Sequence, residues 1–442
     1  MSLNALSPRR RSDILDALRR GTVPQDGLDV LAVGLARFQD AMDQELAKIS
    51  DGGSGFKAVR GEYGCGKTFF SRWLQERARS QNLATTEVQV SETETPLHKL
   101  ETVYRRMTER LSTASARSGA FRGVLDSWFY ALEEDAISSG NIDPNDAQAL
   151  LAATNQLMER RLDSISRQAP SFSAALRGYR EALARGDTAI AEGLVAWLSG
   201  QPNVAAGVKK VANIKGTVDH VAALSFMQGL LVVLKDSGHP GMVLVLDEVE
   251  TLQRVRADSR EKALNALRQL IDELDAGRFP GLLLVITGTP SFFDGPQGMR
   301  KLPPLAQRLH TDFDTDIRFD NPRAPQIRLK PFDFEMLIEV GRKVRDIFAD
   351  GSSARDRIYE MGDDALIESL AKAVSGTLGG KTGIAPRIFL KKLVTDILDR
   401  IELYETFDPR KDYRITIRQD ELSAEERNLM PASSVEDIRL EL

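Results

Sequence analysis

Eight consecutive residues near the start of the chain have the types and spacing that can hold a polyphosphate. They fit the pattern G-x-x-x-x-G-K-S/T and are, in order, Gly61, Glu62, Tyr63, Gly64, Cys65, Gly66, Lys67 and Thr68. The glycines let backbone N–H groups turn inward around phosphate oxygens, and Lys67 supplies a positive charge to the outer phosphates. The Thr68 hydroxyl can bind Mg²⁺. A glycine-rich turn without a ligand is the alternative, but strand-like residues before the loop and helix-like residues after it give the order that a phosphate loop requires.

Two carboxylates form a second group suited to phosphoryl chemistry. Asp247 and Glu248 directly follow the apolar residues 242–246, which predict a buried strand of a parallel sheet. Because such sheets bind ligands at the carboxyl ends of their strands, Asp247 can hold Mg²⁺ and Glu248 can act as general base on an attacking water. N-capping of the following helix is the alternative, which the phosphate loop disfavours. We expect the nearby Glu250 to be solvated or to cap that helix.

Three further polar residues occupy positions where a nucleotide could be sensed. Thr287 ends the apolar run 282–286, and its hydroxyl would reach the γ-phosphate or its water if this strand lies between the other two. Capping of a turn is its alternative role. Arg308 is either a finger on the nucleotide of a neighbouring subunit or a surface salt bridge. Arg387 begins a helix directly after a proline, a position that favours presentation to a cleft.

The chain contains one cysteine, which excludes an internal disulfide and, with only four scattered histidines, a Cys/His zinc site. A reducing, cytoplasmic location is therefore expected. This residue, Cys65, lies inside the phosphate loop, where two interpretations are open. It is either a small residue that fits the loop, which we favour, or a thiolate whose pKa is lowered by Lys67 and a helix N-terminus.

Length and charge limit the class of protein. At about 150 residues per domain, 442 residues predict two to three domains. The net charge of -5 argues against coating nucleic acid through overall charge, although not against a local basic groove. The longest apolar stretch, 221–234, is too short to cross a bilayer, so no membrane contact is expected. Four short basic clusters are either solvated helix faces or contacts to nucleic acid: Arg9 with Arg10 and Arg11, Arg19 with Arg20, Arg105 with Arg106, and Lys209 with Lys210.

The patterning along the chain predicts an α/β fold. Apolar or β-rich runs at 56–59, 86–90, 242–246 and 282–286 predict strands of a parallel sheet, and residues 317–319 are also strand-like. Helical periodicity dominates elsewhere. The organisation that we predict has four parts: an N-terminal helical preamble at 1–50, a phosphate-loop core at 51–325 with a helical insertion at about 97–235, a helical lid at 326–405, and a polar, partly disordered tail at 406–442.

With these residues the chain resembles AAA+ ATPases of the additional-strand, catalytic-glutamate (ASCE) class of P-loop NTPases, and its C-terminal part resembles their Orc/Cdc6-type branch. More narrowly, the order of the segments 14–21, 31–34, 61–68 and 246–250 is similar to that in the ATP-binding proteins of BREX phage-defence systems. The sequence departs from the common AAA+ pattern in its large insertion. No full finger motif surrounds Arg308.

The resemblance implies a role for each candidate residue, with ATP and Mg²⁺ as cofactors. Thr68 and Asp247 would contact Mg²⁺, and Glu248 would be the catalytic base. Thr287 would be the first sensor and Arg387 the second sensor in the lid. Arg308 would be the finger of a homo-oligomer, and Val23 and Pro24 would lie near the adenine.

The function that follows is a Mg²⁺-dependent, ATP-hydrolysing motor or switch in bacterial phage defence, acting on DNA or a DNA-bound complex. The alternative is an ATP-dependent scaffold that turns over poorly and recruits other defence proteins. A GTPase is disfavoured because the guanine motif Asn-Lys-x-Asp is not found. DNA contact rests on the resemblance alone.

Overall fold

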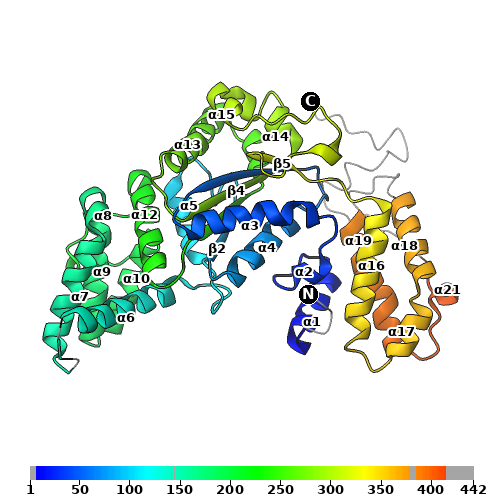
Figure 1. Cartoon of the computed structure of the whole chain (residues 1–442), viewed down its shortest axis with the longest axis horizontal. Helices are drawn as coiled ribbons and strands as arrows, with labels where there is room; N and C mark the ends of the chain where they lie inside the picture. Colours follow the sequence, from blue (N-terminus) through cyan, green and yellow to red (C-terminus); the bar gives the residue numbers. More distant parts are fainter. Residues whose placement is uncertain (1–5, 141, 144, 378–384, 415–442) are drawn as a thin grey trace.

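A parallel five-stranded sheet forms the centre of the computed structural model, which describes residues 6–140, 142–143, 145–377 and 385–414 (Figure 1). The strand order is β2-β3-β4-β1-β5. The four runs predicted as strands are strands, and a short fifth strand was not predicted. Their bounds are β1 Gly55–Arg60, β2 Ala84–Gln89, β3 Met242–Asp247, β4 Leu282–Gly288 and β5 Gln326–Arg328.

The prediction of a strand at residues 317–319 is wrong. These residues form the 3-10 helix η4, Ile317–Phe319. The carboxylate of Asp316 accepts a hydrogen bond from the backbone N–H of Arg318 at 2.9 Å, which closes a turn. Phe319 is 75% exposed, so its apolar side chain does not pack in the core of a sheet.

Alternate residues of the central strands face two different cores, which explains their continuous apolar sequences. One face packs on α3 (Ala36–Ser50) and α4 (Lys67–Ser80), and we name this layer the sheet–α4 core. The opposite face packs on α13 (Ala257–Asp275) and the insertion, and forms the sheet–insertion core. The first layer receives Val243, Val245, Leu283 and Val285; the second receives Leu244, Leu246, Leu284 and Ile286.

The insertion is helical, as predicted, and its core continues that of the sheet. An aromatic cluster lies at its centre, where the ring of Phe226 contacts Tyr104, Phe172 and Trp197 at centroid distances of 5.8, 4.9 and 5.6 Å. The helices are α5 Leu100–Glu109, α6 Phe121–Gly140, α7 Ala147–Arg161, α8 Asp163–Gln168, α9 Pro170–Ala184, α10 Thr188–Leu198, α11 Ala206–Val211 and α12 His220–Asp236.

The C-terminal helices form a third body, at the opposite end of the sheet from the insertion (Figure 1). The helix α1, Pro8–Arg19, packs into this C-terminal core through Ile14, Leu15 and Leu18. Residues 415–442, most of the predicted tail, lie outside the described residues. The C-terminal elements are α16 Phe334–Ala349, α17 Arg355–Met361, α18 Asp364–Thr377, α19 Ala385–Lys391, the π-helix η6 Lys392–Leu398, α20 Asp399–Leu403 and α21 Pro409–Asp412.

The preamble therefore divides between two cores. Its first helix belongs to the C-terminal core and α3 packs on the sheet, whereas α2 (Leu28–Leu31) contributes Leu28 to the core on the sheet and Leu31 to the C-terminal core. The ion pair between Arg19 and Asp399, with a nitrogen–oxygen distance of 2.7 Å, adds to the attachment of α1. Short elements complete the core: η2 Val249–Gln253, α14 Pro290–Asp294, η3 Met299–Lys301 and α15 Pro303–Arg308.

Candidate nucleotide-binding site

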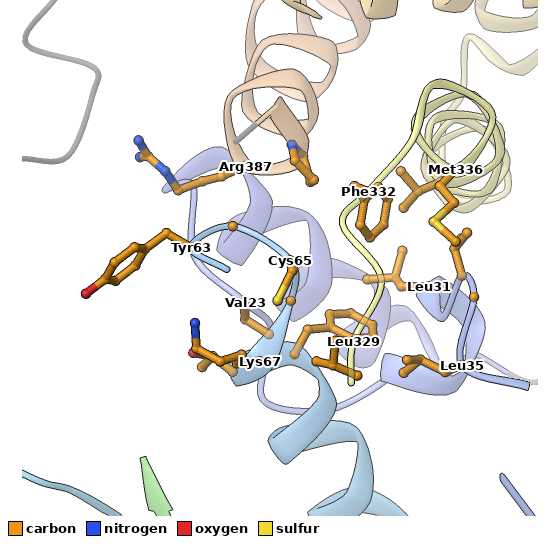
Figure 2. Close-up of a pocket in the computed structure, with 18 of the residues that line it drawn as sticks. Val23, Leu31, Leu35, Tyr63, Cys65, Lys67, Leu329, Phe332, Met336 and Arg387 are labelled. Atoms are coloured by element: carbon orange, nitrogen blue, oxygen red, sulfur yellow. The ribbon is translucent and has the colours of Figure 1, made fainter. Parts of the chain in front are cut away.

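A cavity of about 580 Å³ lies between the phosphate loop, the carboxyl ends of the strands and the C-terminal helices (Figure 2). It brings together residues that are far apart in the sequence, including most of the predicted site. The predicted residues that line it are Val23, Pro24, Tyr63, Gly64, Cys65, Gly66, Lys67, Thr68, Asp247, Glu248 and Arg387.

The loop has the backbone geometry that the motif requires. Gly64 and Gly66 have φ values of 79° and 91°, a left-handed conformation that residues with a side chain rarely adopt. Gly61 packs so tightly against the sulfur of Cys65 that a Cβ there would overlap it. The helix α4 begins at Lys67, so its unpaired N–H groups face the mouth of the loop.

Lys67 is held inside the loop by backbone oxygens. Its Nζ donates to the carbonyl of Gly61 at 2.9 Å and to that of Glu62 at 3.2 Å, and it lies 5.1 Å from the ring centroid of Tyr63. Neither Gly61 nor Glu62 lines the cavity. Both contribute to the site by holding the Lys67 ammonium group through their backbone oxygens. Phosphate oxygens would replace weakly charged carbonyl partners with anionic ones, which form stronger hydrogen bonds.

The carboxylate of Asp247 is the centre of a cluster at the ends of β3 and β4. Its Oδ2 lies 3.4 Å from the hydroxyl of Thr68, and its Oδ1 accepts a hydrogen bond from the hydroxyl of Thr287. The backbone N–H of Glu248 donates to Oδ1 at 3.1 Å. Because Asp247 is only 5% exposed, these contacts fix its carboxylate at the edge of the cavity.

Thr287 lies where its strand was expected, because β4 is between β3 and β1. Its side chain is fully buried and does not line the cavity, so the expected direct reach to a phosphate is not seen. The hydroxyl instead donates to Asp247 and accepts the N–H of Glu248 at 3.3 Å. This geometry gives Thr287 a supporting position behind the carboxylates.

Glu248 has a strained backbone and a side-chain partner that the sequence did not reveal. Its φ of 61° is left-handed, which is uncommon for a residue with a side chain and occurs where function overrides local preference. Gln89 Nε2, at the end of β2, donates to Glu248 Oε2 at 2.9 Å. A signal for Gln89 was its polar side chain near the carboxyl end of the predicted strand 86–90, at the ligand-binding edge.

Glu250 is neither solvated nor a helix cap, which corrects the expectation from the sequence. It is 5% exposed, lines the cavity, and its Oε2 has no hydrogen-bond partner within the described part of the chain. Burial raises the pKa of Glu250, and the nearby positive charge of Lys67 opposes that shift. The short turn η2 causes this burial, because it directs the side chain back toward the phosphate loop.

Cys65 is a buried, loop-filling residue. Burial raises the pKa of its thiol, and the charge of Lys67 only partly opposes this shift. The alternative of a low-pKa thiolate is therefore wrong, because desolvation outweighs the neighbouring ammonium group.

The other end of the cavity is apolar and is built from distant segments. Val23 and Pro24 come from the preamble, whereas Phe332 and Met336 precede and begin α16 (Figure 2). Arg387 lies on α19 beside Gly21, where a Cβ would be 3.6 Å from its Nη1. The apolar character of this end suits an aromatic base.

Arg308 lies outside the cavity. Its guanidinium pairs with Asp272 at 2.8 Å and with Asp275 at 2.6 Å, both on α13. These groups are between 39% and 61% exposed, so the ion pairs contribute little to stability.

The donor set at the phosphate end fits Mg²⁺. A hydroxyl oxygen of Thr68 and a carboxylate oxygen of Asp247 approach each other at the mouth of the loop. Mg²⁺ prefers oxygen ligands and is commonly bound by one or two protein groups together with water and phosphate. No cluster of three or more His, Cys, Asp or Glu side chains suited to a metal occurs among the residues that the structure describes.

The model of the family described as BREX system ATP-binding protein BrxC/D matches residues 6–417. The chain belongs to this family. The match spans the preamble, sheet, insertion and C-terminal helices, and it supports ATP as the ligand and phage defence as the setting. Comparison with curated proteins and with solved structures found no match. Within the described part of this BREX-family chain, no helix has both the length and the apolar character that a membrane span requires.

Proposed function

We propose that this chain is a Mg²⁺-dependent ATPase of the AAA+ class whose hydrolysis drives or gates a conformational step in phage defence, in the cytoplasm. The observation that carries the proposal is the cluster of Thr68, Asp247, Thr287 and Glu248 beside the phosphate loop. A site that only bound nucleotide would not require a carboxylate placed one residue beyond the Mg²⁺ ligand.

Each residue has a distinct part in the proposed reaction. The loop N–H groups and Lys67 bind the phosphates, and Thr68 and Asp247 would hold Mg²⁺, which would neutralise charge on the phosphates. Glu248 accepts a proton from the attacking water while the water oxygen bonds to the γ-phosphorus and the bond to the leaving ADP oxygen breaks. Gln89 positions the Glu248 carboxylate through the hydrogen bond at 2.9 Å.

The C-terminal helices are the proposed lid. The cavity has Lys67 on one wall and Arg387 and Phe332 on the other, so a bound nucleotide would bridge the two bodies. A ligand shifts a conformational equilibrium only by the difference in its contacts with the two states. Loss of the γ-phosphate removes such contacts, and the lid would then reopen. The proposed assignment to the Orc/Cdc6-type branch rests on the sequence resemblance of the C-terminal part.

DNA or a DNA-bound complex is the proposed substrate of the motion, and other defence proteins are proposed partners. Arg308 would act as a finger in a homo-oligomer after exchanging its surface ion pairs for a neighbouring nucleotide. A second function, an ATP-dependent scaffold with little turnover, is favoured by one observation. Glu248 is already held by Gln89, so release of the carboxylate could limit the rate.

The rate of ATP hydrolysis with and without single- and double-stranded DNA, across salt concentration, tests the proposal. A DNA-stimulated rate that falls steeply with salt is expected, because phosphate contacts release counterions. A flat, DNA-independent rate would favour the scaffold. Mixing Arg308→Ala with Glu248→Gln subunits should restore some activity if sites are shared between chains. If the mixture shows no activity and the protein is a monomer in solution, Arg308 is not a finger.

A further inference from the structure

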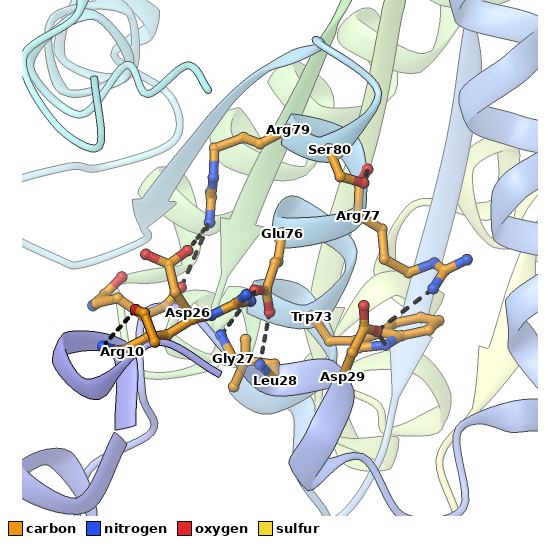
Figure 3. A network of polar contacts seen from close by, with 12 residues as sticks. Arg10, Asp26, Gly27, Leu28, Asp29, Trp73, Glu76, Arg77, Arg79 and Ser80 are labelled. Carbon is orange, nitrogen blue, oxygen red and sulfur yellow. Dashed lines mark hydrogen bonds and ion pairs between the residues drawn. The ribbon is translucent and has the colours of Figure 1, made fainter. Parts of the chain in front are cut away.

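The phosphate-loop helix α4 binds the preamble through a buried carboxylate. Glu76 lies on this helix and is 7% exposed. Its two oxygens accept hydrogen bonds from successive backbone N–H groups, that of Gly27 at 2.8 Å and that of Leu28 at 2.7 Å (Figure 3). Arg10 of α1 forms an ion pair with the same carboxylate. A buried charge with three donors is well satisfied, so its geometry is fixed.

Further side chains of α4 continue this contact on both sides of Glu76. Arg72 Nη1 donates to the backbone oxygen of Val23 at 2.6 Å, and Arg79 pairs with Asp26 at 3.0 Å. Trp73 Nε1 donates to Asp29 at 2.8 Å. One face of the helix thus holds residues 23–29, which include the first turn of α2, as Figure 3 shows for residues 26–29.

The held segment is the one that lines the apolar end of the cavity. Val23 and Pro24 face the cavity, and Gly27, with a φ of 81°, turns the chain from them into α2. Apolar contacts are not directional, so they do not by themselves fix the distance between this segment and the ring of a bound base. The hydrogen bonds from α4 supply that distance.

We propose that Glu76 and Arg72 are positioning residues for the nucleotide base, which they hold indirectly by fixing segment 23–28 against the phosphate-loop helix. This inference rests on the proposed binding of ATP in the cavity. It adds that affinity for the base and affinity for the phosphates depend on different faces of the same helix. The N-terminus of α4 meets the phosphates, and the side of the helix that carries Arg72 and Glu76 positions the segment that contacts the base.

The test is calorimetric titration of the full chain with MgADP and, separately, with Mg²⁺ and pyrophosphate, which lacks the nucleoside. Glu76→Gln loses one of the two acceptor oxygens and puts an amide N–H against a backbone N–H. We expect it to weaken MgADP binding about tenfold, the size of one charge-assisted hydrogen bond, with pyrophosphate affinity unchanged. A general loss of folding would weaken the binding of both ligands equally.

Asp43→Asn is the matched control, because Asp43 lies on α3 and pairs with Arg77 of α4 at 2.6 Å, and the variant leaves the longer contact of Arg77 with Asp29, at 3.5 Å, in place. It should leave both affinities unchanged. Arg72→Gln decides the question if the Glu76 variant does not fold, since it removes only the bond to the Val23 oxygen and a long pair with Glu87. Equal losses for the two ligands, or no loss of ADP affinity, would overturn the proposal. A parent chain that binds neither ligand would instead contradict the proposed function.

Discussion

The two ends of the cavity are built in different ways. The phosphate end comes from one eight-residue loop and the carboxyl ends of neighbouring strands, and buried hydrogen bonds among Thr68, Asp247 and Thr287 connect its parts. The base end comes from the preamble, the segment before α16 and α19. Chemistry that needs exact placement of charge is thus set by local backbone geometry, whereas recognition of the base depends on how separate bodies pack.

Because the two ends are built differently, substitutions at one end should have different effects from substitutions at the other. A change at the phosphate end should alter binding of every ligand that carries phosphates, or the reaction itself. A change at the base end should alter only ligands that carry the nucleoside. The C-terminal helices line mainly the base end, and in the proposed function Arg387 is their link to the γ-phosphate.

The largest effect is expected from Glu248→Gln. Loss of a general base slows a reaction by about 10²–10⁴-fold, and the amide still accepts the hydrogen bond from Gln89. MgADP affinity should remain that of the parent chain, because the residue serves the reaction and not the ligand. Steady-state release of phosphate measures the rate; hydrolysis at the parent rate would show that Glu248 is not the base.

Lys67→Ala should weaken the binding of both MgADP and pyrophosphate. The ammonium group meets the phosphates, so MgADP and pyrophosphate should each lose about 100-fold in affinity, as expected for a charge-assisted contact of 1.5–3 kcal/mol. Calorimetric titration of both ligands measures this. Intact binding of ADP would remove the phosphate-loop assignment, and a selective loss of ADP would contradict the division of the cavity.

Phe332→Ala tests the base end in isolation. The ring lines the cavity opposite Val23, and loss of an aromatic contact worth about 0.5–1.5 kcal/mol should weaken MgADP binding by up to about tenfold. Pyrophosphate affinity should not change. Phe319→Ala removes an exposed ring that does not line the cavity and is the control. If Phe332→Ala weakens pyrophosphate equally, the two ends are not independent.

Glu250→Gln should leave the reaction in place and produce a gain in stability that depends on pH. Because burial raises the pKa of Glu250 above 4.5, the unfolded chain loses this proton at lower pH than the folded chain. Folding is therefore penalised as the pH rises above 4.5, and the glutamine variant escapes this cost of about 1–3 kcal/mol.

Thermal unfolding of parent and Glu250→Gln chains at pH 8 and pH 5 measures that difference. The variant should be more stable at pH 8, with a smaller advantage at pH 5. A variant less stable than the parent at pH 8 would show that attraction by the nearby charge of Lys67 outweighs the burial of Glu250.

Most of the phosphate end could be predicted from the sequence, because loop spacing and apolar strands are local signals. The position of Thr287 between two other strands was only a condition at that point, and the strand order of the structure supplies it. Glu250 could not be placed, since a 3-10 turn rather than a helix follows Glu248 and reverses the side chain's direction. The strand at 326–328 was missed because three residues, Gln326, Ile327 and Arg328, carry no periodicity.

The base end was mostly beyond prediction. Val23 and Pro24 were named through resemblance to a family, and both line the cavity. Their partners on α4 could not be inferred, because Glu76 and Arg72 look like ordinary helix-surface charges in the sequence. Only the packing of the preamble along α4 buries Glu76 and gives its carboxylate two backbone donors.

Photolabelling with an azido-adenine analogue of ATP tests most directly that one nucleotide spans both ends of this cavity. The label should attach to peptides containing Val23 and Pro24 or Phe332 and Met336, should be displaced by ATP, and should be lost in Lys67→Ala. Labelling that survives Lys67→Ala, or that falls only on peptides outside the cavity, would contradict the account.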